Sequence, residues 1–173
     1  SLASWVYPTA NEPIAVLSKI DEAAAFRGYD VVIEQGKVAM HIIHHWADNG
    51  LKVIARQPLP LKEWHHIVLT YDGTSKAQGV KLYVDGREQP LDISNDKLDG
   101  KGTLKTKTPF HIGRRTNSIP FRGVLDEVRV YKSLLTPEDA AKLAAGKETA
   151  GLAEILKTPT AERTTAQREQ LRR

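Results

Sequence analysis

The sequence contains no cysteine among its 173 residues. A disulfide framework, a thiol nucleophile and a cysteine-based zinc site are therefore excluded. No apolar run approaches the roughly 18 residues that a membrane-spanning helix needs, and the first residues lack the charged-then-apolar pattern of an export signal. A chain of this length can still bury roughly 70% of its surface without covalent crosslinks, so we expect one self-supporting domain.

The sequence also has little excess charge. Its formal charge is +4, with 25 lysines and arginines against 21 aspartates and glutamates. Acidic and basic residues are interleaved, and no contiguous basic stripe carries exposed aromatic residues between its charges. The pattern therefore predicts that nucleic acid is not a partner.

Aromatic residues are absent after residue 131. The apolar residues alternate before this point and recur at helical spacing after it, which indicates a change from strands to helices. The sequence therefore divides into a β region over about 1–131 and an α-helical extension.

The β region contains short runs rich in β-branched and aromatic residues, bounded by pairs such as Gln35-Gly36 and Asp85-Gly86 that suit tight hairpin turns. No helical segment separates the runs, so the pattern favours an antiparallel β-sandwich over a parallel sheet. Residues 87–109 are rich in Pro, Asn, Asp and Gly and are predicted to be the longest loop. The expected strands are 3–7, 15–20, 29–34, 38–45, 52–56, 64–71, 80–84, 110–113 and 123–131.

The helical extension begins at Thr136-Pro137, where a hydroxyl can cap the helix and proline suits its first turn. Gly146 is the expected stop. A short apolar stretch over 152–156 and a polar helix over 160–173 follow, and neither can bury itself. We therefore assign 1–146 to a β-sandwich with a closing helix, and 147–173 to a polar helical tail or linker.

Three ordered segments resemble the laminin-G-like branch of the concanavalin A-like lectin and glucanase fold. They are Ser4-Trp5-Val6-Tyr7-Pro8, the strand pair over 64–73 and 80–86, and the closing strands over 110–113 and 121–131. The resemblance implies an all-β antiparallel sandwich of the concanavalin A-like jelly-roll type with a short C-terminal α-helical extension. It also implies that Trp5 points into the core. Members of this family have a first strand before the Ser4–Pro8 element, and here that strand either was cut away or comes from elsewhere.

The segment over 152–164 is similar to the sequence that follows laminin-G-like inserts in large multidomain bacterial proteins with a cytochrome c-type domain. This likeness implies an extracytoplasmic parent protein, secreted, periplasmic or on the cell surface, whose other domains are partners of this one. No haem is expected here, because the Cys-x-x-Cys-His attachment motif is absent.

Glucanases of this fold carry a Glu-x-Asp-x-Glu arrangement on one strand, whose spacing of two puts the carboxylates on one face. The sequence has no such triad, because Asp126 and Glu127 are adjacent and should point to opposite faces of a strand. There is also no Gly-x-Ser-x-Gly elbow. We therefore predict that the chain is not an enzyme.

Two kinds of metal site can be considered. The six histidines include His41, His44 and His45 on one expected strand, but alternation divides them between its faces, so a zinc site would need partners from other strands. Domains of the resembled family often bind one calcium ion through an aspartate of the last strand. The resemblance implies this calcium role for Asp126, whose oxygen ligands suit a hard cation.

Sugar binding needs an exposed aromatic ring flanked by amides and carboxylates. Trp46, followed by Asp48 and Asn49 at a hairpin end, is the best candidate, because Trp5 and Trp64 fit core positions. Tyr29 with Asp30, and Arg114-Arg115 with Asn117, are weaker candidate ligand-binding residues.

The leading functional hypothesis is a non-catalytic recognition module for carbohydrate or glycoconjugate, assisted by calcium. The alternatives are a structural spacer that packs on other domains of an exported protein and, less favoured, a glycoside hydrolase.

Overall fold

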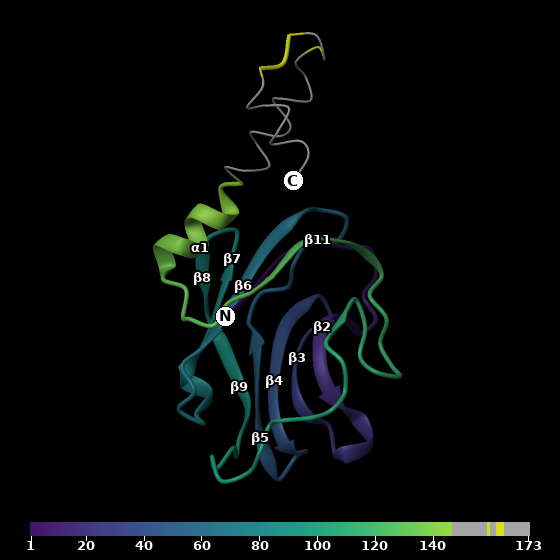
Figure 1. Ribbon diagram of the computed structural model, residues 1–173, viewed down its shortest axis with the longest axis vertical. Helices are drawn as coiled ribbons and strands as arrows, with labels where there is room; N and C mark the ends of the chain where they lie inside the picture. Colours follow the sequence, from purple (N-terminus) through teal and green to yellow (C-terminus); the bar gives the residue numbers. More distant parts are fainter. Residues whose placement is uncertain (147–158, 160–161, 165–173) are drawn as a thin grey trace.

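The computed structural model describes residues 1–146, 159 and 162–164. The part of the chain that it describes forms two packed β-sheets and one α-helix (Figure 1). The strands are β1 (Leu2–Pro8), β2 (Ile14–Asp21), β3 (Arg27–Glu34), β4 (Lys37–His45), β5 (Asn49–Ala55), β6 (His65–Tyr71), β7 (Val80–Val84), β8 (Arg87–Gln89), β9 (Leu91–Asp96), β10 (His111–Ile112) and β11 (Gly123–Val130). Two short 3-10 helices, Glu22–Ala24 and Ala77–Gly79, and α1 (Pro137–Ala144) complete the elements.

The two sheets have five and six strands, in the orders β11-β1-β6-β7-β8 and β10-β2-β3-β4-β5-β9. Every neighbouring pair is antiparallel. The hairpin between β3 and β4 turns at Gln35 and Gly36, which have φ of 51° and 76°, as a two-residue turn of the mirror-image type requires. The predicted antiparallel sandwich is therefore confirmed, and all nine expected strands are present.

Strand alternation forms the core between the sheets. On β3 and β4 the inward residues are Val31, Ile33, Met40 and Ile42, and all four belong to the main apolar cluster. Their outward neighbours form a second set of side chains, in which polar and apolar residues are mixed. The six-stranded sheet thus buries one face and leaves the other available for a site.

Helix α1 covers part of the outer face of the five-stranded sheet (Figure 1). Ala140 is fully buried and packs in one cluster with Ala3, Val68 and Tyr83. Thr136 and Asp139 form a reciprocal capping box at the helix start, which satisfies two otherwise unpaired N–H groups. The predicted start of this helix is confirmed, while the stretches predicted over 152–156 and 160–173 lie largely outside the described residues. No helix among the described residues has the length and apolar character needed to span a membrane.

The predicted loop over 87–109 is wrong in its first ten residues, because β8 and β9 lie there. β9 extends the six-stranded sheet by pairing with β5, and its register sets Val53 opposite Ile93. The pairing of this edge strand outweighs the Pro90 and Asn95 signals that favour a loop. The remaining segment, about 97–109, has no regular secondary structure.

The core positions expected for Trp5 and Trp64 are also wrong. β1 turns Leu2, Ser4 and Val6 inward, so Trp5 lies on the outer face, where its ring meets that of His66 at a centroid distance of 5.1 Å. Trp64 is 45% exposed and lies against Tyr7 on the same face. The alternation of β1 therefore decides the direction of Trp5, whatever its hydrophobicity.

The buried position of His66 makes stability depend on pH. Burial lowers the pKa of His66 from 6.5 to about 4, a shift that Asp85 opposes and Arg129 reinforces. Between these values the unfolded chain binds a proton that the folded chain does not. The stability contribution of neutral His66 is therefore complete above about pH 6.5 and is lost as the pH falls toward 4.

When the pH falls from neutral to about 4.5, we expect the free energy of unfolding to drop by roughly 2–3 kcal/mol more in the wild type than in His66→Phe. Urea unfolding at the two pH values measures the difference. His45→Gln is the matched control, because the His45 side chain is 56% exposed and its removal should leave the pH dependence unchanged. An equal change in the free energy of unfolding between the two pH values in all three proteins would contradict the role of His66.

Candidate ligand-binding site

A polar row crosses the outer face of the six-stranded sheet. The register sets Ser18 opposite Asp30, Asp30 opposite His41 and His41 opposite Lys52. Directly opposite residues of antiparallel strands share a face, so these side chains lie side by side. The pairs of His111 with Ser18 and of Lys52 with Asn95 extend the row to both edge strands.

Asp30 is the centre of this row. Its side chain is completely buried, and its two oxygens accept hydrogen bonds from His41 Nδ1 at 2.7 Å and Arg115 Nε at 2.5 Å. Burial by itself raises the pKa of Asp30, but the hydrogen bonds and charges of His41 and Arg115 together hold it below the usual value of 3.8. Asp30 is therefore an ionised carboxylate at neutral pH.

The segment between β10 and β11 brings Arg115 to Asp30. Ile119 packs on the small outward residues Ala15, Val32 and Ala39, and its carbonyl accepts a hydrogen bond from Ala15 N at 3.1 Å. Glu22 holds the same segment by accepting hydrogen bonds from Asn117 N and Ser118 Oγ. Arg115 thus reaches the sheet from a loop that is fixed on both sides.

Phe26 supports the other side of Arg115, whose guanidinium carbon lies 5.7 Å from the ring centroid. Both Ala25 and Phe26 have positive φ, at 52° and 59°, which is uncommon outside glycine and costs of the order of 1–3 kcal/mol per residue. The carbonyl of Ala25 accepts a hydrogen bond from Trp46 N at 2.9 Å. This strained turn therefore places Phe26 and Trp46 around the polar row.

These residues surround a hollow of about 230 Å³, which we call the outer-face pocket. The Trp46 ring meets His41 edge to face, with centroids 5.5 Å apart and planes at 83°. Lys52 Nζ and Glu34 Oε2 form an ion pair of 2.6 Å. The lining consists of Phe26, Glu34, His41, Ile43, Trp46, Lys52 and Arg115.

The outer-face pocket offers donors and acceptors in fixed places. The hydrogen bond to Asp30 uses the Nδ1 atom of His41, which leaves the Nε2 atom of the same ring for a ligand. Arg115 donates to Asp30 through its Nε atom, so its terminal nitrogens are not used in that hydrogen bond. The negative charges of Asp30 and Glu34 balance the positive charges of Lys52 and Arg115. Such a pocket suits a polar ligand without net charge.

Of the predicted ligand-binding residues, the structure places Trp46 and Arg115 in the outer-face pocket. Asp48 is exposed at the hairpin tip, with its carboxylate 4.0 Å from His45. Asn49 turns toward the long loop and accepts a hydrogen bond from Asp99 N. Arg114 donates to the backbone carbonyls of Arg115 and Thr116, and Asn117 is exposed beside Glu22.

The histidines of β4 do not form a zinc site with one another. His41 binds Asp30 on the outer face, while His44 Nδ1 donates to the carbonyl of Thr103. Within the described ranges, no three histidine or carboxylate side chains gather as metal ligands would.

Asp126, predicted to bind calcium, is exposed on β11 and accepts a hydrogen bond from Glu127 N. The neighbouring Glu127 carboxylate is turned to Arg129 at 3.0 Å. These side chains do not fit a calcium site by themselves, because that ion takes about six to eight oxygen ligands. Calcium binding by Asp126 stays a prediction.

Sequence reasoning missed Glu34 and Lys52, and it named Asp30 only as a weaker candidate beside Tyr29, without its partners His41 and Arg115. The usable signal was a polar residue at an outward position on each of three successive strands, within runs that are otherwise apolar. Register is needed to see that these positions coincide, and hairpin lengths alone do not fix it where a strand is bulged, as β4 and β5 are between Ile43 and His45.

The two antiparallel sheets define a jelly-roll β-sandwich, and the outer-face pocket is its candidate site. The sequence profile of the laminin-G-like family described as the concanavalin A-like lectin/glucanases superfamily matches residues 1–141. The chain belongs to this superfamily, as the resemblance of its strand motifs implied.

Solved structures with the same fold include domains with a bound saccharide. The CBM40 of the Ruminococcus gnavus IT-sialidase, bound to α2,3-sialyllactose, shares 15% identity over 83% of this chain and 80% of its own, with a TM-score of 0.63. The SAP-like pentraxin of Limulus polyphemus shares 12% identity over 83% and 68% of the two chains, with a TM-score of 0.61. Domain 4 of AbnA, an extracellular GH43 arabinanase of Geobacillus stearothermophilus in complex with arabinotriose, shares 20% identity over 83% and 65%, with a TM-score of 0.51.

Because Asp30 is buried with two charged partners, we expect Asp30→Ala to destabilise the fold by about 3–5 kcal/mol. Urea unfolding at neutral pH measures the loss. Asp92→Ala is the control. It breaks the ion pair between Asp92 and Arg56, whose side chains are 56% and 59% exposed. Loss of such an exposed pair should lower the free energy of unfolding by less than about 1 kcal/mol. The pKa of Asp30 is depressed on folding, so its contribution is present above pH 3.8 and fades as the pH falls through the folded pKa. Equal losses in the two variants would contradict a special role for Asp30.

Proposed function

We propose that this domain is a non-catalytic carbohydrate-binding module and that the outer-face pocket is its binding site. The observation that carries the proposal is the combination, in one pocket of about 230 Å³, of the Trp46 ring with ordered polar groups of both charges. Sugar rings present apolar C–H faces and hydroxyl groups that both donate and accept, so they need this combination.

Each part of the pocket has a distinct role in this proposal. Trp46 packs against an apolar face of the sugar. Glu34 and the Nε2 atom of His41 accept hydrogen bonds from sugar hydroxyls, while Lys52 and the terminal nitrogens of Arg115 donate to them. Asp30 contacts no ligand and acts as a positioning residue, because it orients both His41 and Arg115.

The balanced charges favour a neutral sugar unit. A polyanionic ligand would need more positive than negative groups around it. Two of the structures with this fold contain a bound saccharide, sialyllactose and arabinotriose, which supports carbohydrate as the ligand class. Preorganised side chains also lose little conformational freedom on binding, and that raises affinity.

A structural spacer is the second candidate function, and one observation favours it. Trp64 and Val124 are 45% and 51% exposed on the five-stranded sheet, near the Tyr7 ring that Trp64 contacts. Apolar groups grouped in this way often mark contact with another protein surface. In the spacer, this face would pack on a neighbouring domain of the parent protein, and the outer-face pocket would bind no ligand.

We also propose an extracytoplasmic site of action within a larger protein. The arabinanase whose domain 4 has this fold is extracellular by its description. Polysaccharides outside the cell are a natural target for such a module.

We expect Trp46→Ala to weaken sugar binding at least about tenfold, a change of about 1.4 kcal/mol, because the apolar face of the sugar loses its contact. A glycan array with neutral oligosaccharides identifies the ligand, and calorimetry with the best of them gives the affinity. Trp64→Ala is the matched control, since it removes an equally large ring from the other sheet and should bind as the wild type does.

A blank array with a folded sample would favour the spacer and overturn the carbohydrate proposal. Loss of binding in Trp64→Ala and its retention in Trp46→Ala would move the site to the five-stranded sheet. Turnover of a bound oligosaccharide would contradict the non-catalytic assignment.

Calcium assistance is a separate proposal with its own test. If Asp126 binds the ion with backbone carbonyl groups, calorimetry should give a saturable heat with Ca²⁺ that Asp126→Asn removes. Sugar affinity measured with excess chelator then shows whether the ion assists binding. No heat in the wild type would remove calcium from the function.

A further inference from the structure

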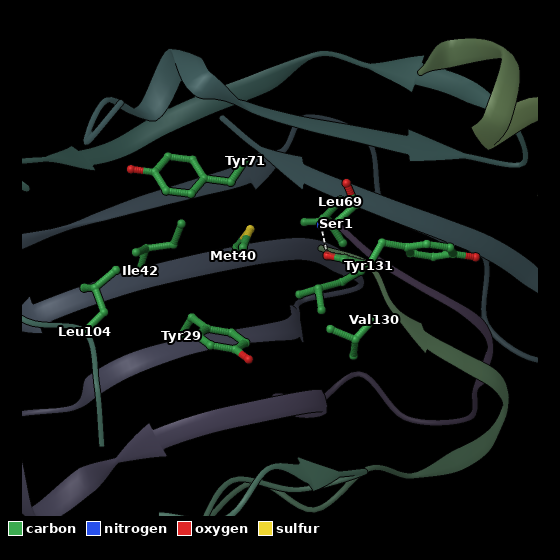
Figure 2. Close-up of a pocket in the computed structure, with 10 residues that line it drawn as sticks. Ser1, Tyr29, Met40, Ile42, Leu69, Tyr71, Leu104, Val130 and Tyr131 are labelled. Atoms are coloured by element: carbon green, nitrogen blue, oxygen red, sulfur yellow. Dashed lines mark hydrogen bonds between the residues drawn. The ribbon is translucent and has the colours of Figure 1, made fainter. Parts of the chain in front are cut away.

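A second cavity opens between the two sheets, on the inner side of β4, and we call it the inter-sheet cavity (Figure 2). Tyr29, Met40 and Ile42 line it from the six-stranded sheet, and Leu69 and Tyr71 line it from the five-stranded sheet. Its remaining walls come from Ser1, Leu2, Leu104, Val130 and Tyr131. The cavity shares no lining residue with the outer-face pocket.

The walls of the inter-sheet cavity are apolar and carry no charged side chain. The amino group of Ser1 donates to the carbonyl oxygens of Tyr131 and Ser133. The Tyr71 hydroxyl accepts a hydrogen bond from Ser75 N at 2.7 Å, which fixes its ring. The mostly apolar walls therefore disfavour a charged ligand, which would lose its hydration in the cavity.

The size of the cavity limits what can enter it. Its volume is about 220 Å³, whereas an apolar cavity of roughly 150 Å³ in another protein stays dry and binds benzene. One six-membered ring with a small substituent therefore fits, and a disaccharide does not.

The residues that surround the space favour an aromatic ring over an alkyl chain. The two tyrosine rings come from opposite sheets, and aromatic pairs gain about 0.5–1.5 kcal/mol beyond the area they bury. Met40 adds a polarizable thioether, whose contacts with aromatic rings are also favourable. Tyr29 is half-buried at the cavity, so its hydroxyl is in reach of a polar substituent at the ring edge.

We propose that the inter-sheet cavity binds one small neutral aromatic ring of the size of phenol. This site is independent of the proposed sugar site, because adjacent residues of β4 point to opposite faces of the sheet. His41 and Ile43 line the outer-face pocket, while Met40 and Ile42 line the inter-sheet cavity. A single domain can thus hold a sugar and an aryl group at the same time.

Met40 is the only methionine of the chain, and it gives a direct probe. Protein labelled with ¹³C at the methionine methyl group shows one methionine methyl resonance, which comes from a wall of the cavity. Titration with phenol should shift this resonance upfield and saturably, because the methyl group would lie near the face of the bound ring. Cyclohexanol, which has a similar size but no ring current, should cause a much smaller shift and bind more weakly.

Leu104→Trp is the variant that tests the location. Leu104 lies in the loop before β10 and is only partly buried, so a larger side chain there can fill the cavity without disturbing a strand. We expect it to remove the phenol-induced shift of Met40. Trp46→Ala should leave the shift unchanged, even where it abolishes sugar binding.

Thermal unfolding gives a second readout. A ligand of the folded state raises the free energy of unfolding according to its concentration and affinity, so phenol should raise the Tm of the wild type but not of Leu104→Trp. Leu104→Phe serves the same purpose if the tryptophan variant does not fold. The proposal is overturned if the Met40 resonance does not move saturably in the wild type, or if it moves equally in a folded Leu104 variant.

Discussion

The buried carboxylate of Asp30 is the constraint on which the candidate site depends. A charge without access to water must be paired, and Asp30 takes one partner from the adjacent strand and one from a loop 85 residues further along the chain. The same two bonds fix the orientation of His41 and the position of Arg115. A requirement of folding therefore preorganises the groups that would bind a ligand.

One strand serves two surfaces with different chemistry. Alternation along β4 sends Met40 and Ile42 into the core, and His41 and Ile43 to the outer face. Beside the polar row lies an apolar row of Ala15, Val32, Ala39 and Ile54, on which Ile119 packs. The outer face therefore has an apolar cluster next to its polar groups. The loop that covers this apolar row also delivers Arg115, so the packing of Ile119 and the electrostatics of Asp30 support each other.

Much of the fold could be predicted from the sequence, because runs such as 64–71 and 80–84 alternate clearly and the Asp85-Gly86 pair suits a tight turn. β9 was not predicted, because it is stabilised by pairing with β5, a strand distant in the sequence, whereas Pro90 before it and Asn95 within it are signals that favour a loop. The family resemblance implied a core position for Trp5, whereas the alternation of Leu2, Ser4 and Val6 points it outward. Within the site, Trp46 could be found from its place at a hairpin end, whereas the contact between Asp30 and Arg115 depends on the folded path of a loop.

The two outer faces of the sandwich explain why the site lies on the six-stranded sheet. On the five-stranded sheet, α1 packs on Ala3, Val68 and Tyr83, and the rings of Trp5 and His66 fill the neighbouring space. Burial there drives His66 to its neutral form, so that face does not offer a charged histidine to a ligand. On the six-stranded sheet, Phe26 and Trp46 instead form walls around a hollow lined by three charged side chains, Glu34, Lys52 and Arg115, each of which is in an ion pair. Recognition of a polar ligand needs such ordered and still accessible groups, and among the pockets of the described residues this one combines them with an aromatic wall.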